Sequence, residues 1–348
     1  MTSWVPFAER RNIRMKRGLC IILILLFLAA FLLLIPSATL AEIISIPIDK
    51  DPKLGACDSC YIYEENAADP VGYEDPSISV RISRGVYHNT SYVAARVKIN
   101  SVTQLRSAFS GRFGTESAVL GTSLAKSMNA VFAVNGDYYT SKNGHGYLTR
   151  QGHQYRKKCK SEYDILMIDY HGDLHILQKP DNEALDAYIA TLDNADPAIV
   201  NGLDTSDKNF DSKVYQSFSF GPGLVIDGVQ YKGFTEKTHS GISAERPAQR
   251  MAIAQVGPLE YLFVASSSPE DYKLDGSVGL TLDEFSDLVY SFGGIINAYN
   301  LDGGSSSTMV FRTTKGKFGK MNSNRNSARF LADIIYFASA WEPDETAE

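Results

Sequence analysis

The chain has 348 residues, of which 44% are hydrophobic and 21% are charged. These proportions are typical of a globular protein, and they exclude a disordered chain, a collagen-like fibre and a coiled coil. The formal net charge of −6 argues against a nucleic-acid partner, because proteins that bind nucleic acids usually carry a basic surplus.

Residues 1–41 have the pattern of a transmembrane or signal segment. A basic flank over residues 10–17 precedes an unbroken apolar run over residues 19–35. The run is near the lower limit for crossing a bilayer and slightly long for the core of a signal peptide. An uncleaved anchor is favoured by that length, while cleavage near Ala41 stays open. In either case the basic flank stays inside, which predicts an extracytoplasmic protein, membrane-anchored or secreted.

Residues 42–77 are rich in Pro, Asp and Gly and are interpreted as a linker or arm. Beyond them, the residue pattern predicts a strand-rich domain. The expected strands are 78–84, 92–99, 130–134, 163–170, 174–177, 218–226, 251–256, 261–265, 295–299, 309–312 and 330–337, and the expected helices are 116–128 and 182–190. Residues 196–213 are polar and predict a loop.

The clearest local signal is a capping box formed by Thr281 and Glu284, which predicts the start of an amphipathic helix that ends at Gly293 and Gly294. Because strands outnumber helices and most connect as hairpins, we expect a mixed α/β (α+β) single domain over residues 78–340. A polar tail, 341–348, follows it.

The cysteines favour a structural role. Cys20 lies in the apolar run, Cys57 and Cys60 form a CxxC pair, and Cys159 is left over. No second ligand pair is near for a metal site, and no βαβ context surrounds the pair for a thioredoxin-like site. One bond from Cys57 or Cys60 to Cys159 is possible in an oxidising compartment, and a redox role for the CxxC pair is a weaker alternative.

Two loops that begin with asparagine carry the candidate chemistry. One is Asn135-Gly136-Asp137, directly after an apolar strand, and the other is residues 300–308, NLDGGSSST. Paired glycines allow the backbone to approach a ligand closely, and successive amides in such turns can form an anion site. This composition fits a polyoxygenated or phosphorylated ligand, although a plain Gly/Ser-rich turn has the same pattern. The known phosphate-binding loops, the serine-hydrolase elbow and the common metal motifs are missing from the sequence.

Several motifs follow one another in a fixed order. They are AVNGDYY (133–139), GY (146–147) with Arg150, FGPGLVIDG (220–228), RMAI (250–253), GLTLDE (279–284), YNLDGG (299–304), and Arg329 with DIIY (333–336). In this combination residues 78–338 resemble the phosphodiester glycosidase family, in particular its exported bacterial members labelled exopolysaccharide biosynthesis proteins. Three positions depart from the family pattern: Ser305 replaces a glycine, residues 265–268 replace Val-Asp-Gly-Arg, and Ala254 replaces a glycine.

The resemblance implies a hydrolase that cleaves the bond between an anomeric carbon and a phosphate oxygen. Its substrate would be a glycosyl-1-phosphodiester, of the N-acetylhexosamine type or within a cell-envelope glycopolymer. Because phosphate leaves easily, the two carboxylates of an ordinary glycosidase are not obligatory. Asp302 is expected to be the lead catalytic carboxylate and Asp137 the second. The expected substrate-binding residues are Asn135, Gly136, Arg150, Arg250, Asn300, Gly303, Gly304, Ser306, Ser307 and Arg329.

An alternative interpretation is non-catalytic. The departures at Ser305 and at residues 266–268 favour a protein that binds a cell-envelope glycan during exopolysaccharide assembly or export. Neither interpretation requires a cofactor. A divalent cation is possible, and Asp302 and Asp137 could share it if the two loops face each other.

Overall fold

The computed structural model describes residues 46–48, 57–65, 70–137, 146–160, 162–237, 243–268, 276–312, 317–322 and 329–342. The chain divides into residues 1–42 and 43–348, and the description below concerns the second unit. Within the described ranges, no helix is both long and apolar enough to cross a bilayer. The predicted membrane segment, 19–35, lies outside them.

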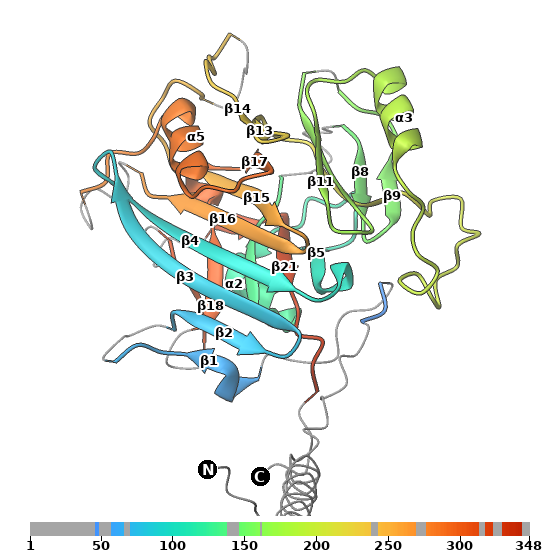
Figure 1. Ribbon diagram of the computed structural model, residues 1–348, viewed down its shortest axis with the longest axis horizontal. Coiled ribbons are helices and arrows are strands. Elements are labelled where there is room, and N and C mark those ends of the chain that lie inside the picture. The colour runs from blue at the N-terminus through green and yellow to red at the C-terminus, as the bar shows by residue number, and fades with distance from the viewer. Residues whose placement is uncertain are drawn as a thin grey trace, which may run out of the picture. The chain divides into compact units, whose positions relative to one another are not determined.

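The largest sheet has nine strands and forms one layer of the domain (Figure 1). Its order is β1 (Tyr61–Ile62), β2 (Gly72–Asp75), β3 (Ile78–Tyr87), β4 (Thr90–Ile99), β16 (Glu260–Ser266), β15 (Met251–Gly257), β17 (Asn297–Leu301), β13 (Gly223–Ile226) and β14 (Val229–Gln230). Residues 61–62 and 72–75, within the segment interpreted as an arm, thus contribute the first two strands.

Four smaller sheets complete the described part of the chain. A five-stranded sheet has the order β19 (Phe318–Lys320), β18 (Met309–Arg312), β7 (Phe132–Asn135), β21 (Asp333–Phe337) and β5 (Leu105–Phe109). A three-stranded sheet has the order β11 (Leu174–Leu177), β10 (Ile165–Asp169) and β12 (Val214–Phe218). Two two-stranded sheets pair β20 (Phe330–Leu331) with β6 (Val119–Leu120) and β8 (Leu148–Arg150) with β9 (His153–Arg156). The described α-helices are α2 (Gly121–Ser127), α3 (Asn182–Thr191) and α5 (Leu282–Ser291).

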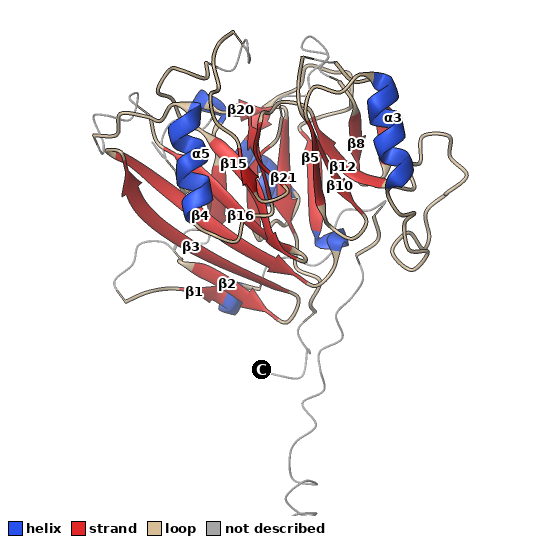
Figure 2. Ribbon diagram, turned by 45° about the horizontal axis from the view of Figure 1, so that its top comes forward, coloured by secondary structure: helices blue, strands red, loops and turns tan. Residues whose placement is uncertain are grey.

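Strand alternation separates the core into layers. Phe132 and Val134 of β7 face the nine-stranded sheet, whereas Ala133 between them faces α2. In the large sheet, Ile253 of β15 joins the same central core, while Ala252 packs on the other side under α5. Figure 2 shows α5 lying across that outer face. The functional loops therefore leave strands that are buried on both faces and cannot shift easily.

The strand-rich fold is confirmed, with antiparallel pairing at every described ladder. The hairpins β10–β11 and β15–β16 lie where they were predicted. The capping box is confirmed as well, because the Thr281 hydroxyl accepts from the Glu284 N–H and the Glu284 carboxylate accepts from the Thr281 N–H.

Several predicted elements have different bounds. The helix expected over 116–128 begins only at Gly121, after the short strand β6. The strand expected over 218–226 is interrupted by the cis Gly221–Pro222 peptide bond and divided between two sheets. The strand expected over 330–337 is likewise divided, between β20 and β21. The strand expected over 295–299 is shifted to 297–301, so Asn300 lies in β17 rather than in the loop.

The three described cysteines are free thiols. Cys57 and Cys60 pack against the central core, whereas Cys159 packs in a separate cluster beside α3 and donates its thiol to the Pro180 carbonyl at 3.1 Å. The bond to Cys159 that the sequence left possible is therefore not formed here.

Candidate functional site

The two asparagine loops lie side by side, at the junction between the nine-stranded and five-stranded sheets. β7 ends at Asn135, whose Nδ2 donates to the Asp302 carbonyl at 2.7 Å and whose Oδ1 accepts from the Thr308 N–H at 3.0 Å. β17 belongs to the large sheet and ends at Leu301, so the loop that follows it crosses from one sheet to the other. The buried Asn135 amide therefore fixes both ends of the second loop against the first.

Asp302 directly follows the C-terminal end of β17 and lines a small pocket. The pocket is formed by Asn135, Gly136, Asp302, Ser306, Arg329, Phe330, Leu331, Ala332 and Asp333. Five of the residues predicted from the sequence thus meet in one place. Arg329 is exposed at this pocket and its guanidinium donates to the Ser305 hydroxyl.

Desolvation raises the pKa of Asp302 to about 6, and the nearby charge of Asp137 acts in the same direction. A hydrogen bond with Ser306, the charge of Arg329 and the Gly303 N–H oppose this shift. A carboxylate with a pKa near neutrality can accept a proton from water and release it again. Asp302 therefore has the electrostatic character expected of a general base.

The glycine pair shapes the loop. Gly304 adopts φ of +54°, a left-handed conformation that favours glycine, and its N–H donates to the Gln249 carbonyl at 2.9 Å. The N–H groups of Ser306 and Ser307 donate to carbonyls of Gly303 and Gly304. These three amides are therefore used within the protein and are not available to bind a phosphate.

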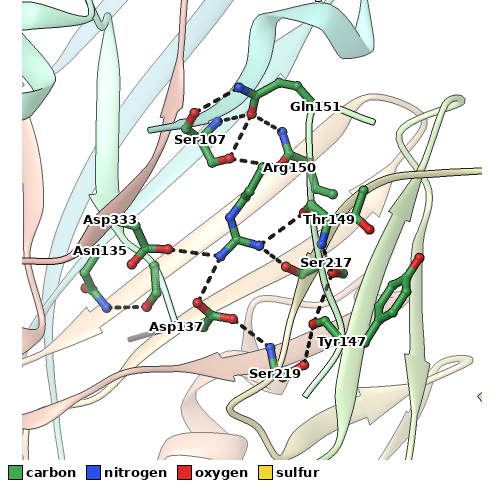
Figure 3. Close-up of polar contacts among 12 residues, drawn as sticks. Ser107, Asn135, Asp137, Tyr147, Thr149, Arg150, Gln151, Ser217, Ser219 and Asp333 are labelled. Carbon is green, nitrogen blue, oxygen red and sulfur yellow. Dashed lines mark hydrogen bonds and ion pairs between the residues drawn. The ribbon is translucent and has the colours of Figure 1, made fainter. Parts of the chain in front are cut away.

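Arg150 is the centre of a buried ionic cluster (Figure 3). Its Nη2 lies 2.9 Å from Asp137 Oδ1 and 3.0 Å from Asp333 Oδ2, and all three side chains are at most 3% exposed. Nη1 donates to the carbonyls of Thr149 and Ser217. The guanidinium carbon lies 4.2 Å from the ring centre of Phe218. Arg150 is thus held by two carboxylates, and one of them, Asp333, lines the pocket.

Both carboxylate oxygens of Asp137 accept hydrogen bonds from within the protein. Its second oxygen, Oδ2, accepts from the Ser219 N–H at 2.8 Å. The predicted role of Asp137 as a second catalytic carboxylate stays a prediction, and its observed contacts suit a residue that orients Arg150. His145, close in sequence, lies outside the described residues, as do Tyr138 and Tyr139.

Asp333 is a site residue whose role the sequence analysis missed. It begins β21, lines the pocket beside Asp302, and contacts Arg150. The available signal was a single charged residue inside the apolar stretch 330–337, FLADIIYF. A carboxyl group in a strand of this kind is buried and requires a partner, which is a recognisable mark of a functional position.

Gly136 leaves room for Asp333. A Cβ at position 136 would lie 2.2 Å from Asp333 Oδ2, so any side chain there would displace the carboxyl group. We expect Gly136→Ala to lower kcat/KM by about 100-fold, since displacements of this size in a site have such effects. Gly257→Ala is the matched control, because its Cβ would meet nothing closer than 3.5 Å. Equal steady-state kinetics for both variants would contradict this role of Gly136.

Three other predicted residues are occupied by contacts within the protein. The Arg250 guanidinium donates to the carbonyls of Leu280, Ser243 and Arg246, and desolvation lowers its pKa to about 10. Asn300 donates to the Gly221 carbonyl at 2.7 Å, and the buried Ser307 hydroxyl donates to the Arg250 carbonyl. Their part in substrate binding stays a prediction; the observed contacts support the loop from behind.

The departure at residues 266–268 has a structural counterpart. The Ser266 hydroxyl accepts from the Arg250 N–H at 3.0 Å, and the Ser268 hydroxyl accepts from the Gln249 side chain at 3.0 Å. These buried serines join the end of β16 to the residues that precede β15. They therefore contribute to the support of the Gly303–Gly304 turn, which rests on the Gln249 carbonyl.

A second, larger cavity has a volume of about 340 Å³ and includes Arg150 in its lining. It is lined by Ile48, Arg150, Gln151, Gly152, His153, Tyr155, Leu203, Asp204, Asp207 and Phe210. It contains neither Asp302 nor Arg329. The smaller pocket is therefore the better candidate for the reaction centre, since the loop residues converge there.

A metal site was left open by the sequence. Among the residues that the structure describes, no group of three or more His, Cys, Asp or Glu side chains is arranged to hold a metal ion. The divalent cation that the sequence left open stays a prediction.

A family model described as phosphodiester glycosidase matches residues 128–338, more than half of the chain. The matched range contains the complete pocket, from Asn135 to Asp333. A comparison with curated proteins finds no match.

Solved structures with a similar fold share little sequence with the chain. The catalytic domain of zebrafish N-acetylglucosamine-1-phosphodiester alpha-N-acetylglucosaminidase, auto-inhibited by its pro-peptide, is 14% identical with a TM-score of 0.50, covering 80% of this chain and 86% of that one. A hypothetical protein from Synechocystis is 14% identical with a TM-score of 0.48, covering 75% of this chain but only 62% of that one. A Burkholderia pseudomallei protein described as exported is 12% identical with a TM-score of 0.43, covering 71% and 74%. At these identities the likeness is one of fold.

Proposed function

The chain belongs to the phosphodiester glycosidase family, and on that premise we propose that it hydrolyses the bond between the anomeric carbon and the phosphate oxygen of a glycosyl-1-phosphodiester. The products are a free sugar and a phosphomonoester. The name of the zebrafish relative supports a substrate of the N-acetylhexosamine type, and a cell-envelope glycopolymer is the other candidate.

The observation that carries this proposal is the meeting of Asp302 and Arg329 in one pocket. A phosphodiester is an anion, and Arg offers the planar, forked donor that suits phosphate oxygens. A carboxylate of raised pKa beside that cation can take a proton from a water molecule that attacks the anomeric carbon. Ser306, also in the pocket and hydrogen-bonded to Asp302, keeps the carboxylate in place.

In the proposed step, a water oxygen forms a bond to the anomeric carbon while Asp302 takes a proton from that water. The bond from the anomeric carbon to the phosphate oxygen breaks, and its electron pair stays on that oxygen. Arg329 stabilises the charge that develops on the departing phosphate. Asp302 then releases its proton to solvent, which restores the starting state.

The proposed location is extracytoplasmic. The basic flank and the apolar run in residues 1–41 support export of the domain, with the run as an anchor or a cleaved signal.

The proposal is tested by sugar release from a panel of glycosyl-1-phosphodiesters, each beside the methyl glycoside of the same sugar. We expect the purified full-length chain to release sugar from a phosphodiester and to leave the methyl glycosides intact, because an alcohol is a far poorer leaving group. No release from any phosphodiester would contradict the proposal. Glycan binding without release would support the glycan-binding alternative, for which the departure from the family pattern at Ser305 is the motive; Ser305 accepts a hydrogen bond from the pocket cation Arg329.

A further inference from the structure

The buried cluster around Arg150 has more negative than positive groups. One guanidinium nitrogen serves both Asp137 and Asp333, at 2.9 and 3.0 Å, and all three side chains are almost completely removed from solvent. With every group ionised, the cluster holds one uncompensated negative charge. A buried charge without a partner is costly, and a carboxyl group relieves that cost by taking up a proton.

The pocket in front of this cluster has no spare positive charge. Asp302 and Arg329 line it together with Asp333, and their own charges cancel. A phosphodiester that enters brings a further negative charge to a poorly solvated place, where like charges repel strongly. Binding is therefore favoured when one carboxyl group is neutral.

The hydrogen bonds show which carboxyl group holds the proton at least cost. Asp137 accepts from Arg150 and from the Ser219 N–H, and Asp302 is stabilised by Ser306 and by the Gly303 N–H. Such bonds favour the ionised form. Asp333 has only Arg150 as a described donor to its carboxyl group.

The neighbouring carboxylates around Asp333 also favour its neutral form, because they raise its pKa. Burial, the charge of Asp137 and the charge of Asp302 together raise the pKa of Asp333 to about 7, against the opposing effect of Arg150. The other titratable or charged side chains on the strands around this cluster are Arg106 of β5, His153, Tyr155 and Arg156 of β9, Tyr215 of β12, Tyr299 of β17 and Tyr336 of β21. His153 lines the larger cavity with Arg150 and is not among the residues of the pocket. Burial raises the pKa of Tyr155, Tyr215 and Tyr299, so these side chains are neutral near pH 7. The described contacts of the Arg106 guanidinium are with Tyr336 and with main-chain carbonyls.

We propose that Asp333 is a further substrate-contacting residue, which binds the phosphodiester in its neutral form and donates the carboxyl hydrogen to a phosphate oxygen. Arg150 positions this carboxyl group through its contact with Oδ2, and Gly136 leaves it room against the backbone. The proton stays on Asp333 throughout, so no bond is made or broken by it. The inference rests on the proposed function for the identity of the anion.

The test uses dimethyl phosphate, which carries one negative charge at every pH used, so that any change in its affinity comes from the protein. Its dissociation constant for the full-length chain is measured by calorimetry between about pH 5.5 and 9. We expect the constant to rise about tenfold per pH unit above about pH 7, as Asp333 loses its proton. Uncharged trimethyl phosphate is the matched ligand and should show a smaller rise, because it loses the hydrogen bond from Asp333 but is not repelled by the ionised carboxylate.

Two variants assign the effect. Asp333→Asn keeps a neutral group of the same shape, so its affinity for dimethyl phosphate should stay constant above pH 7. Asp302→Asn should retain a rise of the same steepness, displaced to lower pH, because it leaves Asp333 in place but removes a charge that raises the pKa of Asp333. A rise that persists in Asp333→Asn, a flat profile for the wild type, or no binding at pH 5.5 would each overturn the inference.

The two proposals fail in different ways. Sugar release by the wild type without proton-linked binding leaves the phosphodiester glycosidase assignment in place and removes this role of Asp333. Proton-linked binding that is lost in Asp333→Asn, without sugar release from any phosphodiester, supports the role of Asp333 and contradicts the hydrolytic function.

Discussion

Asp302→Asn is expected to lower kcat/KM by about 10² to 10⁴-fold, which is the usual contribution of a positioned acid or base. The amide keeps the shape of the carboxylate and its place at the end of β17, but it cannot take a proton from water. The KM should change less than kcat, since Arg329 still binds the phosphate. Steady-state kinetics on the phosphodiester that is cleaved fastest would measure both constants.

Asp169→Asn is the matched control. Asp169 is also buried and pairs with His175 at 3.0 Å, but it lies in the three-stranded sheet, away from the pocket. Its replacement should leave kcat/KM close to the wild-type value. A comparable loss in both variants would mean that the Asp302 effect is structural.

The assignment of Asp302 as the base determines the direction in which kcat/KM changes with pH. The active form of Asp302 is ionised, and its pKa is raised to about 6. The wild-type kcat/KM should therefore rise as the pH increases through about 6. In Asp302→Asn this rise should disappear from the residual activity.

Arg150→Met is expected to have the largest effect on stability. It removes the cation that both Asp137 and Asp333 contact and leaves two buried carboxyl groups without their partner. Breaking a buried ion pair in this way typically costs about 3–5 kcal/mol. Thermal or urea unfolding measures this cost, and the folded fraction should also lose activity because Asp333 is no longer held at the pocket.

Arg106→Met is the control that separates the loss of stability from the loss of activity. Arg106 is equally buried, and its described partners, the Tyr336 hydroxyl and main-chain carbonyls, do not include Asp137 or Asp333. This variant should lose stability while retaining kcat/KM at a temperature where it stays folded. If Arg150→Met has normal activity when folded, Arg150 does not position the site.

Local elements could be predicted from the sequence because their signals are local. The capping box at Thr281 and the hairpin β15–β16 depend on residues that are close in the chain. The strand expected over 330–337 was wrong in its bounds because its apolar pattern continues across Ala332, where the chain passes from one sheet to another. The pattern reports burial, and it does not distinguish two buried strands from one.

The site was only partly predictable. The residue types of the loops at Asn135 and Asp302 indicated a polar ligand, and the resemblance to a family supplied the reaction. That these loops touch through the Asn135 side chain depends on pairing between β7, β18 and β21, which come from distant parts of the chain. The same long-range pairing brings Asp333 to the pocket, and its partner Arg150 could not be predicted from local residue patterns.

The source of the oxygen in the products tests the central claim most directly. Hydrolysis in ¹⁸O-labelled water distinguishes cleavage at the anomeric carbon from cleavage at phosphorus. A glycosidase places the label on the released sugar and leaves the phosphomonoester unlabelled, which is the result we predict. Label in the phosphomonoester, with an unlabelled sugar, would show attack at phosphorus and contradict the assignment of Asp302 as the base that directs water to the anomeric carbon.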